Sequence, residues 1–305
     1  MSLQGFKDQV GEDLWALIER VSAPLVTVTI VTSLPSVWCQ RASFRLQFAD
    51  GRVLKGRRCE TSDQAERIEY LARFLNHQRF PKVLARCRSA LLTEWIEGRP
   101  LTFADYKPDL LARCGELQGW IHRIPLPHAA SPDHLSLSSR QTDLDRSIQL
   151  LVAGGVLAKQ EGRRIFDLAM AHAPDTFAVG FIHGDFCAEN IVLRPPEHIS
   201  VIDNDTVLID AYDYDLGRTW YRWPMNRTQI EVYYSGYRQY RSPDSFITHF
   251  PYWAVSALVD SAKFRLRSRA QGLSIPVRRL RAIVDGVQTE MCPDLRFPPQ
   301  ETRNG

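Results

Sequence analysis

The chain has 305 residues, of which 44% are hydrophobic and 24% are charged. A chain of this length and composition buries a large core as one or two domains, which excludes a disordered chain, a collagen and a small disulfide scaffold. The 38 Lys and Arg residues against 35 Asp and Glu residues give a net charge of +3, which is too small to indicate nucleic-acid binding by charge alone.

Neither the start of the sequence nor its cysteines indicate export or a metal site. The first residues include charges and no apolar core, so we expect no secretory signal. The six cysteines form no CxxC pair and no metal-ligand spacing, which favours a reducing, cytoplasmic location. Residues 21–40 lack charge, but they contain two prolines and alternate Val with Thr. We therefore predict a strand and a loop there and no membrane span.

Residues 1–95 predict a small β-rich lobe built around one helix. Residues 26–33 (VTVTIVTS) alternate apolar and polar side chains, as a half-buried strand does. Two further strand-like runs are joined by Asp50-Gly51, the strongest short signal for a hairpin. Short apolar runs within residues 82–98 complete a mostly antiparallel sheet.

The helix of this lobe is expected after Thr61. Thr61 offers an N-cap, and apolar residues recur at helical spacing from Ala65 to Leu75. Residues 76–78 (Asn-His-Gln) are expected to end it.

Residues 96–305 predict a larger, mainly helical lobe. A β-rich lobe joined to a helical lobe places a ligand cleft at their junction. Apolar helical faces and short strand-like runs alternate along this part of the sequence. The helical faces lie at 110–121, 148–152, 253–264 and 276–287, and the strand-like runs lie between 178 and 205.

The residues with the clearest chemical pattern follow the first of these strand-like runs. The run HGDFCAEN at 183–190 places Asn190 five residues after Asp185, and Asp203 follows Asn190 by thirteen residues. Transfer of a phosphoryl group from ATP requires a carboxylate that orients the acceptor and hard oxygen ligands for Mg²⁺. These three residues supply that set. The alternative interpretation is that they are turn residues after strands.

HGDFCAEN and the following IDND resemble the catalytic loop and the metal-binding strand of the aminoglycoside phosphotransferase and choline kinase family, relatives of the protein kinases. The resemblance implies an α+β, bilobal protein kinase-like fold that binds ATP and Mg²⁺. It implies that Asp185 is the catalytic base and that Asn190 and Asp203 bind Mg²⁺, with Asp205 as a candidate for a second metal ion. His183 is expected to brace the loop rather than to take part in the chemistry.

The resemblance extends to residues that would bind the nucleotide. LLTEWIEGRPL at 91–101 resembles the family's hinge, which implies that backbone groups of Glu94 and Ile96 meet the adenine edge. Lys55, at the end of the run VLK, resembles the lysine that binds the α and β phosphates. A glutamate on the following helix would hold this lysine. Glu69 fits the family spacing best, and Glu66 is the alternative.

One segment departs from the pattern of many kinases. Residues 32–43 (TSLPSVWCQRAS) contain no glycine where a glycine-rich loop often covers the phosphates. This departure leaves open a non-catalytic, nucleotide-binding pseudokinase that acts as a partner-binding module. Downstream, YDLGR resembles a family segment whose aspartate, here Asp215, braces the catalytic loop.

Two stretches allow alternative interpretations. Residues 212–241 hold nine Tyr and Trp residues together with five arginines, which could stack on a sugar or a base or could form a packed helical bundle. A nucleic-acid-binding module is the least favoured interpretation of this stretch. Residues 263–281 hold seven basic residues and no acidic one, and a solvated helical face is expected there.

These observations predict a kinase that transfers the γ-phosphoryl group of ATP to a hydroxyl of a small molecule. The segment from IDND to YDLGR is too short for a peptide-docking loop, which favours a small acceptor over a protein. Candidate acceptors are an aminoglycoside, an amino alcohol, a sugar or an envelope glycan. We expect no nucleic-acid partner, and nothing in the sequence predicts an oligomeric state.

Overall fold

The chain forms two compact units in the computed structural model, which describes residues 3–35, 40–75, 79–102, 105–126, 135–195 and 198–286. The first unit comprises Met1–Ala104 and His183–Leu208, and the second comprises Asp105–Ile182 and Ile209–Gly305. The first unit thus takes its residues from two separated segments of the sequence. The predicted division into residues 1–95 and 96–305 stays a prediction. Within the described ranges, no helix is long and apolar enough to cross a membrane.

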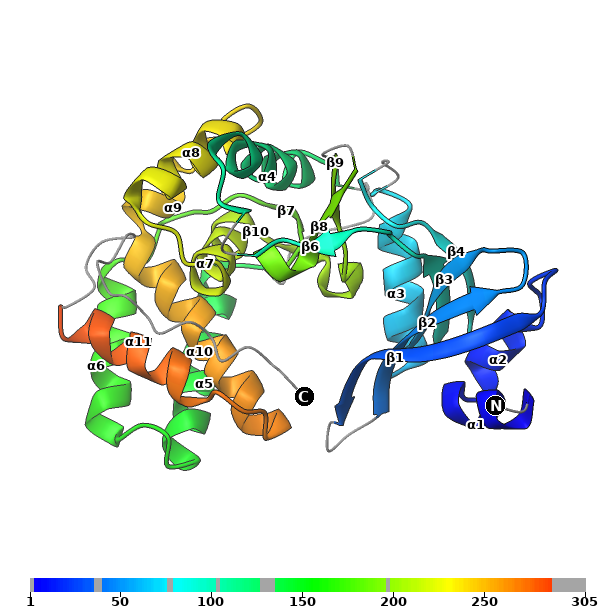
Figure 1. Ribbon diagram of the computed structural model, residues 1–305. Coiled ribbons are helices and arrows are strands. Elements are labelled where there is room, and N and C mark those ends of the chain that lie inside the picture. Colours follow the sequence, from blue (N-terminus) through cyan, green and yellow to red (C-terminus); the bar gives the residue numbers. More distant parts are fainter. Residues whose placement is uncertain are drawn as a thin grey trace. The chain divides into compact units, whose positions relative to one another are not determined.

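A five-stranded sheet forms the centre of the first unit. Its strands are β1 (Leu25–Pro35), β2 (Gln40–Phe48), β3 (Val53–Arg58), β4 (Val83–Cys87) and β5 (Ala90–Glu94). They follow the order β1-β2-β3-β5-β4, and every ladder between them is antiparallel (Figure 1). The predicted hairpin at Asp50-Gly51 joins β2 to β3, with Gly51 at a φ of 85°. The predicted antiparallel sheet is confirmed.

Two short helices precede the sheet, where the sequence predicted none. Helix α1 (Leu3–Val10) and helix α2 (Glu12–Ile18) contain eight and seven residues. Leu14 and Leu17 of α2 are buried in one cluster with Phe44 of β2. Helices this short show too little periodicity to be recognised from the sequence, and burial against the sheet stabilises them.

Helix α3 (Ser62–Ala72) contacts β4 and β5. The predicted cap is confirmed, because Thr61 Oγ1 accepts a hydrogen bond from the backbone N of Gln64 at 3.1 Å. Ala65 and Ile68 of α3 are buried together with Leu91 of β5. The predicted helix end at 76–78 lies outside the described residues, as do residues 36–39 of the glycine-free segment.

The two faces of β3 have different environments. A Cβ atom on Gly56 would lie 2.8 Å from Leu14 Cδ2, so this residue faces the α2 side of the sheet. Side chains alternate along a strand, and Arg57 pairs across the ladder with Leu91, which packs with α3. Lys55 and Arg57 therefore project from the α3 side.

A second, three-stranded sheet in this unit carries the polar segment of the sequence. Its strands are β6 (Arg99–Pro100), β8 (Ile191–Arg194) and β9 (His198–Val201), in the order β6-β8-β9. Both ladders are antiparallel. Residues 183–190 lead into β8, and Asp203 follows β9. The hairpin of β8 and β9 therefore brings these two segments together.

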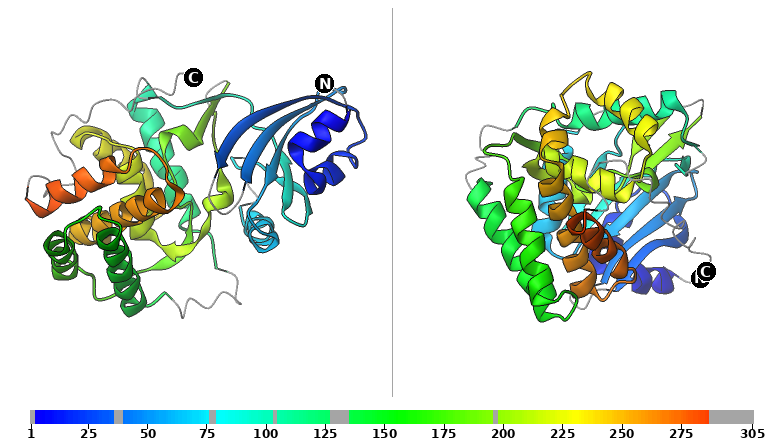
Figure 2. Two further views of the ribbon diagram at one scale, coloured as in Figure 1. Left: turned by 90° about the horizontal axis from the view of Figure 1, so that it is seen from below. Right: turned by 90° about the vertical axis from the view of Figure 1, so that its left-hand side faces the viewer.

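Helices make up most of the second unit. They are α4 (Pro108–Ile121), α5 (Leu137–Ala153), α6 (Lys159–Ala171), α7 (Tyr212–Arg222), α8 (Arg227–Tyr237), α9 (Asp244–Thr248), α10 (Phe250–Ser268) and α11 (Ser274–Val284), and the strands β7 (Val179–Ile182) and β10 (Leu208–Ala211) form a two-stranded sheet. Helix α10 packs against α5, α6, α7 and α11, and Figure 2 shows α5 and α6 side by side next to it. The predicted helical character of this part is confirmed.

Most aromatic residues of the 212–241 stretch are buried. Seven of the nine Tyr and Trp side chains are at most 8% exposed, which supports the packed bundle and not a stacking surface: Tyr212, Trp220, Tyr221, Trp223, Tyr233, Tyr234 and Tyr237.

A buried hydrogen-bond network connects α4, α7 and α8. Asp215 Oδ2 accepts hydrogen bonds from Gln118 Nε2 and His122 Nε2, each at 2.9 Å. His122 Nδ1 accepts a hydrogen bond from the Tyr237 hydroxyl at 2.8 Å, and the Tyr233 hydroxyl donates to Gln118 Oε1. None of these five side chains is more than 1% exposed. The network satisfies polar groups that would otherwise be costly to bury.

Candidate active site

The loop of residues 183–190 requires a glycine at its second position. Gly184 has a φ of 76°, which disfavours residues with a Cβ atom. A Cβ atom there would also lie 2.6 Å from the backbone O of Thr206. The glycine therefore lets the loop approach the segment that follows Asp203.

His183 links the loop to the strand segment before Asp203. Its side chain is fully buried. Nδ1 accepts a hydrogen bond from the backbone N of Asp185 at 3.3 Å, so Nε2 carries the proton and donates to the backbone O of Ile202 at 3.2 Å. This arrangement matches the bracing role that the sequence predicts for His183.

Asn190 fixes the carboxylate of Asp185. Its Nδ2 atom donates to the backbone O of Asp185 at 2.9 Å and to Oδ2 of Asp185 at 3.2 Å. Asn190 is the last residue of a 3₁₀ turn (Ala188–Asn190) that directly precedes β8. Because the amide nitrogen is engaged in these bonds, the amide oxygen is the atom that can serve as a metal ligand.

Asp203 adopts a backbone conformation that is uncommon for a residue with a side chain. Its φ and ψ are 63° and 40°, in the left-handed region, which Asp tolerates better than most residues. The Thr206 hydroxyl donates to the backbone O of Asp203 at 3.2 Å and helps to hold this turn. Strained conformations of this kind are concentrated at functional sites.

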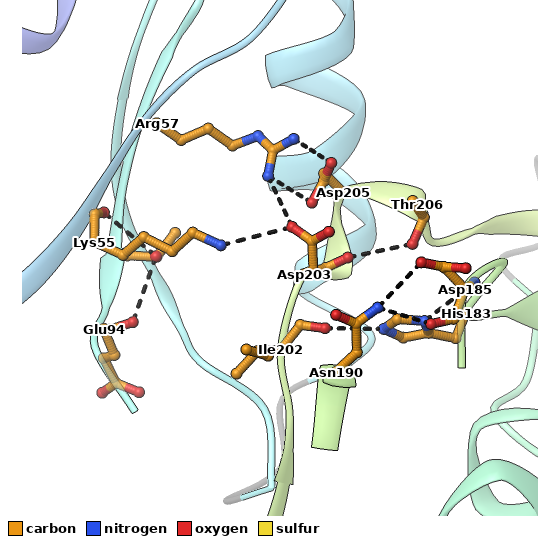
Figure 3. Close-up of polar contacts among 11 residues, drawn as sticks. Lys55, Arg57, Glu94, His183, Asp185, Asn190, Ile202, Asp203, Asp205 and Thr206 are labelled. Atoms are coloured by element: carbon orange, nitrogen blue, oxygen red, sulfur yellow. Dashed lines mark hydrogen bonds and ion pairs between the residues drawn. The ribbon is translucent and has the colours of Figure 1, made fainter. Parts of the chain in front are cut away.

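Two cations from β3 approach the Asp203 carboxylate (Figure 3). Lys55 Nζ lies 3.7 Å from Asp203 Oδ1, and Arg57 Nη1 lies 3.2 Å from the same oxygen. Arg57 also binds Asp205 through both Nη atoms. Arg57 was not among the predicted site residues, although its spacing of two residues from Lys55 on a predicted strand places both side chains on one face.

These contacts shift the pKa values of both aspartates. Burial acts to raise the pKa of Asp203, but a hydrogen bond with Asp205 and the charges of Lys55 and Arg57 outweigh it and hold this pKa well below its ordinary value. For Asp205, burial raises the pKa to about 6, against the opposing charge of Arg57.

The predicted pair of Lys55 with Glu69 is not formed among the described residues. Glu69 Oε2 instead accepts a hydrogen bond from Arg86 Nε at 2.7 Å, because Arg86 on β4 lies beside α3. The alternative residue, Glu66, is exposed. A role of Glu69 in holding Lys55 in the nucleotide-bound protein stays a prediction.

The predicted hinge residues lie at and just after the end of β5, whose last residue is Glu94. The backbone N of Glu94 donates to the backbone O of Lys82 at 3.0 Å, and Glu94 Oε2 accepts from the backbone N of Lys82 at 3.1 Å. The amide of Glu94 is thus engaged, and its carbonyl accepts a hydrogen bond from the Thr93 hydroxyl at 3.5 Å. Contact of this backbone with adenine stays a prediction. Ile96 is half-buried in the irregular segment after β5.

The donor set fits Mg²⁺. Asp203 offers a carboxylate and Asn190 offers an amide oxygen, both hard ligands of the kind Mg²⁺ takes. In the part of the chain that the structure describes, no group of three His, Cys, Asp or Glu side chains could hold a metal ion. Two protein ligands are what a metal held mainly by substrate phosphates and water requires.

All predicted site residues fall within the first unit. Lys55, Glu69, Glu94 and Ile96 come from its first segment, and Asp185, Asn190 and Asp203 come from its second. The structure brings Lys55 to Asp203 and Asn190 to Asp185.

Comparisons with known proteins agree with these observations. Residues 31–246 match the model of a family described as the phosphotransferase enzyme family. A comparison with curated proteins finds no match.

Solved structures share the fold at low sequence identity. A choline kinase from Streptococcus pneumoniae has a TM-score of 0.68 at 11% identity, with 93% of this chain and 98% of that chain covered. A macrolide 2'-phosphotransferase from Brachybacterium faecium has a TM-score of 0.59 at 16% identity, with 90% and 98% covered. A spectinomycin phosphotransferase solved with ADP and spectinomycin has a TM-score of 0.62 at 13% identity, with 91% and 98% covered. The α+β, protein kinase-like fold is thereby confirmed.

Proposed function

The chain belongs to the phosphotransferase enzyme family and is an ATP-dependent small-molecule kinase acting on an alcohol group, and we propose that Asp185 is its catalytic base. The observation that carries this proposal is the fixed arrangement of the loop. Asn190 holds the Asp185 carboxylate, and His183 ties the same loop to the segment that presents Asp203. Such preorganisation is what general-base catalysis requires.

The chemistry assigned to these residues is an in-line transfer. The acceptor hydroxyl oxygen forms a bond to the γ-phosphorus of ATP, the bond from this phosphorus to the bridging oxygen breaks, and ADP leaves. Asp185 orients the hydroxyl and takes its proton. Asn190 keeps one carboxylate oxygen in place through its 3.2 Å hydrogen bond to Oδ2.

Other residues of the first unit are assigned to the nucleotide and the metal. Lys55 would bind the α and β phosphates, with Glu69 as the proposed support for this lysine, and the backbone of Glu94 and Ile96 would meet the adenine. Asn190 and Asp203 are the proposed Mg²⁺ ligands. A metal ion held by these two residues would supply positive charge against the negative charge that develops on the phosphates during transfer.

The acceptor is proposed to be an aminoglycoside, an amino alcohol, a sugar or an envelope glycan. The printed names of the solved relatives include a choline kinase, a macrolide 2'-phosphotransferase and a spectinomycin phosphotransferase. In this chain, Asp205 is separated from the start of α7 at Tyr212 by only the end of a 3₁₀ turn and β10. This short segment has no room for a peptide-docking loop, which supports a small acceptor.

A cytoplasmic location is proposed on the state of the cysteines. Cys59, Cys87, Cys114 and Cys187 are free, as expected in a reducing compartment. Cys39 and Cys292 lie outside the described residues.

An ATP-consumption screen over amino sugars, amino alcohols and simple sugars tests this function. We expect one acceptor class to stimulate Mg²⁺-dependent ATP consumption, and Asp185→Ala to abolish the stimulation. Asp143→Ala is the matched control and should leave the rate unchanged, because Asp143 is 69% exposed in an ion pair with Arg146. If no acceptor raises consumption above the Asp185→Ala level, the assignment of a small hydroxyl acceptor is wrong.

A non-catalytic, nucleotide-binding pseudokinase is the second candidate. The observation that favours it is the contact of Lys55 and Arg57 with Asp203, the proposed metal ligand. A pseudokinase would bind ATP without transferring phosphate, and Asp185→Ala would then change neither binding nor turnover.

A further inference from the structure

Strand β3 directs a second cation at the proposed metal ligand. Arg57 Nη1 and Lys55 Nζ lie 3.2 Å and 3.7 Å from the same oxygen, Asp203 Oδ1 (Figure 3). The proposed binding of phosphates explains the position of Lys55, but it assigns no role to Arg57. The Arg57 side chain is 89% removed from solvent. A charge buried to this extent is costly unless it is paired, so its position next to Asp203 is not that of a surface ion pair.

Asp205 anchors this arginine. Arg57 Nη1 donates to Asp205 Oδ1 at 2.6 Å, and Nη2 donates to Asp205 Oδ2. The Asp205 side chain is only 5% exposed. A guanidinium held by two parallel bonds has a fixed orientation, which a lysine ammonium would not have. The Nε atom of Arg57 is buried with no hydrogen-bond partner among the described residues. The bonds from the two Nη atoms to Asp203 and Asp205 therefore set the position of the guanidinium group.

The four charged side chains compensate one another. Asp203 and Asp205 carry two negative charges, and Lys55 and Arg57 carry two positive charges. A divalent ion without nucleotide would therefore approach a group of four side chains with no net charge. To bind Asp203, it would have to displace Arg57. An ion that arrived with nucleotide phosphates would bring negative charge, which gives Lys55 and Arg57 alternative partners.

We propose that Arg57, anchored on Asp205, is a positioning residue that holds Asp203 and keeps free divalent cations off it, so that the metal enters together with the nucleotide. This inference rests on the proposed function, since it takes Asp203 as a metal ligand. It gives Asp205 the role of an anchor for Arg57 instead of a ligand for a second metal ion.

Titration with Mn²⁺ in the absence of nucleotide and acceptor tests the proposal. The free Mn²⁺ signal in electron paramagnetic resonance reports binding to the wild-type protein, Arg57→Met and Arg57→Lys. We expect Arg57→Met to bind Mn²⁺ at least about tenfold more tightly than the wild-type protein, because a full positive charge next to the ligand is lost. Arg57→Lys keeps the charge and should restore most of the exclusion.

Arg52→Met is the matched control. It makes the same substitution on the same hairpin, but Arg52 is 46% exposed and pairs with Asp50, so Mn²⁺ binding should not change. Arg57→Met removes the partner of a buried carboxylate and could prevent folding. The double variant Arg57→Met/Asp205→Asn replaces the pair by neutral side chains. It should also bind Mn²⁺ more tightly than the wild-type protein, because Arg57 no longer has to be displaced from Asp203, but by a smaller factor than Arg57→Met, because the charge of Asp205 is lost too.

Circular dichroism identifies the variants that fold. Two different results would then refute the role of Arg57 and the proposed function separately. Equal Mn²⁺ affinity in the wild-type protein and in a folded Arg57→Met or double variant would refute the role of Arg57, whatever the enzyme does. Absence of MgATP binding by the wild-type protein in calorimetry would refute the proposed function itself.

Discussion

Substitution of Gly184 by Ala should perturb the catalytic loop in a calculable way. A left-handed conformation costs a residue with a Cβ atom roughly 1–2 kcal/mol, and Gly184 has a φ of 76°. The new Cβ atom would also lie 2.6 Å from the backbone O of Thr206. An ordinary carbon-oxygen contact is about 3.4 Å, so the two segments must separate by roughly 0.8 Å.

This separation should reach the proposed catalytic groups. Gly184 lies directly before Asp185, and Thr206 holds the backbone of Asp203 through its hydroxyl. Misplacement of reacting groups by about 1 Å costs on the order of a hundredfold in rate. We therefore expect Gly184→Ala to lower kcat by roughly 30- to 100-fold while the protein remains folded.

Gly155→Ala provides the matched control. Gly155 has a φ of 70°, but a Cβ atom there would meet nothing within 4 Å. In urea unfolding, the strained backbone conformation should lower the free energy of unfolding of both variants by the same amount. Only Gly184→Ala should lose additional stability and turnover. If the two variants had equal kcat, the close approach of the loop to Thr206 would have no catalytic consequence, and the reasoning would be refuted.

Two further predictions concern the second unit. Asp215→Ala removes the acceptor of the buried donors Gln118 and His122, so the free energy of unfolding should fall by about 3–5 kcal/mol in urea titration; a loss below about 1 kcal/mol would contradict the network. Glu161→Gln should cost at most about 1 kcal/mol at pH 7, because its partner Arg281 is 50% exposed. The hydrogen bond from Arg281 lowers the pKa of Glu161, so this stabilisation is present above the ordinary glutamate pKa and is lost as the pH falls through the lowered value. Thermal melts of Glu161→Gln and wild-type protein should therefore differ at pH 7 and converge as the pH falls below the lowered pKa of Glu161, and a difference that persists in acid would contradict the ion pair.

Local signals predicted most of the first unit's elements. The Asp50-Gly51 hairpin and the Thr61 cap depend on residues close in sequence, so their chemistry is visible without the fold. The loop around Asp185 was predictable for the same reason, since its residues lie within one short run.

Features that depend on packing between distant segments were missed. Helices α1 and α2 are too short to show periodicity, and contact with the sheet stabilises them. The pairing of Arg57 with Asp205 joins residues 148 positions apart, and nothing in the sequence near either residue indicates it. The contact of Glu69 with Arg86 on the neighbouring strand also joins separated segments and could not be read from the sequence, and the role of Glu69 toward Lys55 stays a prediction.

The turnover of Asp185→Ala with an identified acceptor tests the central claim most directly. Phosphorus nuclear magnetic resonance would follow the phosphate monoester formed by the wild-type protein, and calorimetry would follow MgATP binding. The account predicts a loss of about 10²- to 10⁴-fold in kcat with nucleotide affinity retained, because general-base positioning contributes about this factor. Wild-type turnover in Asp185→Ala would contradict it.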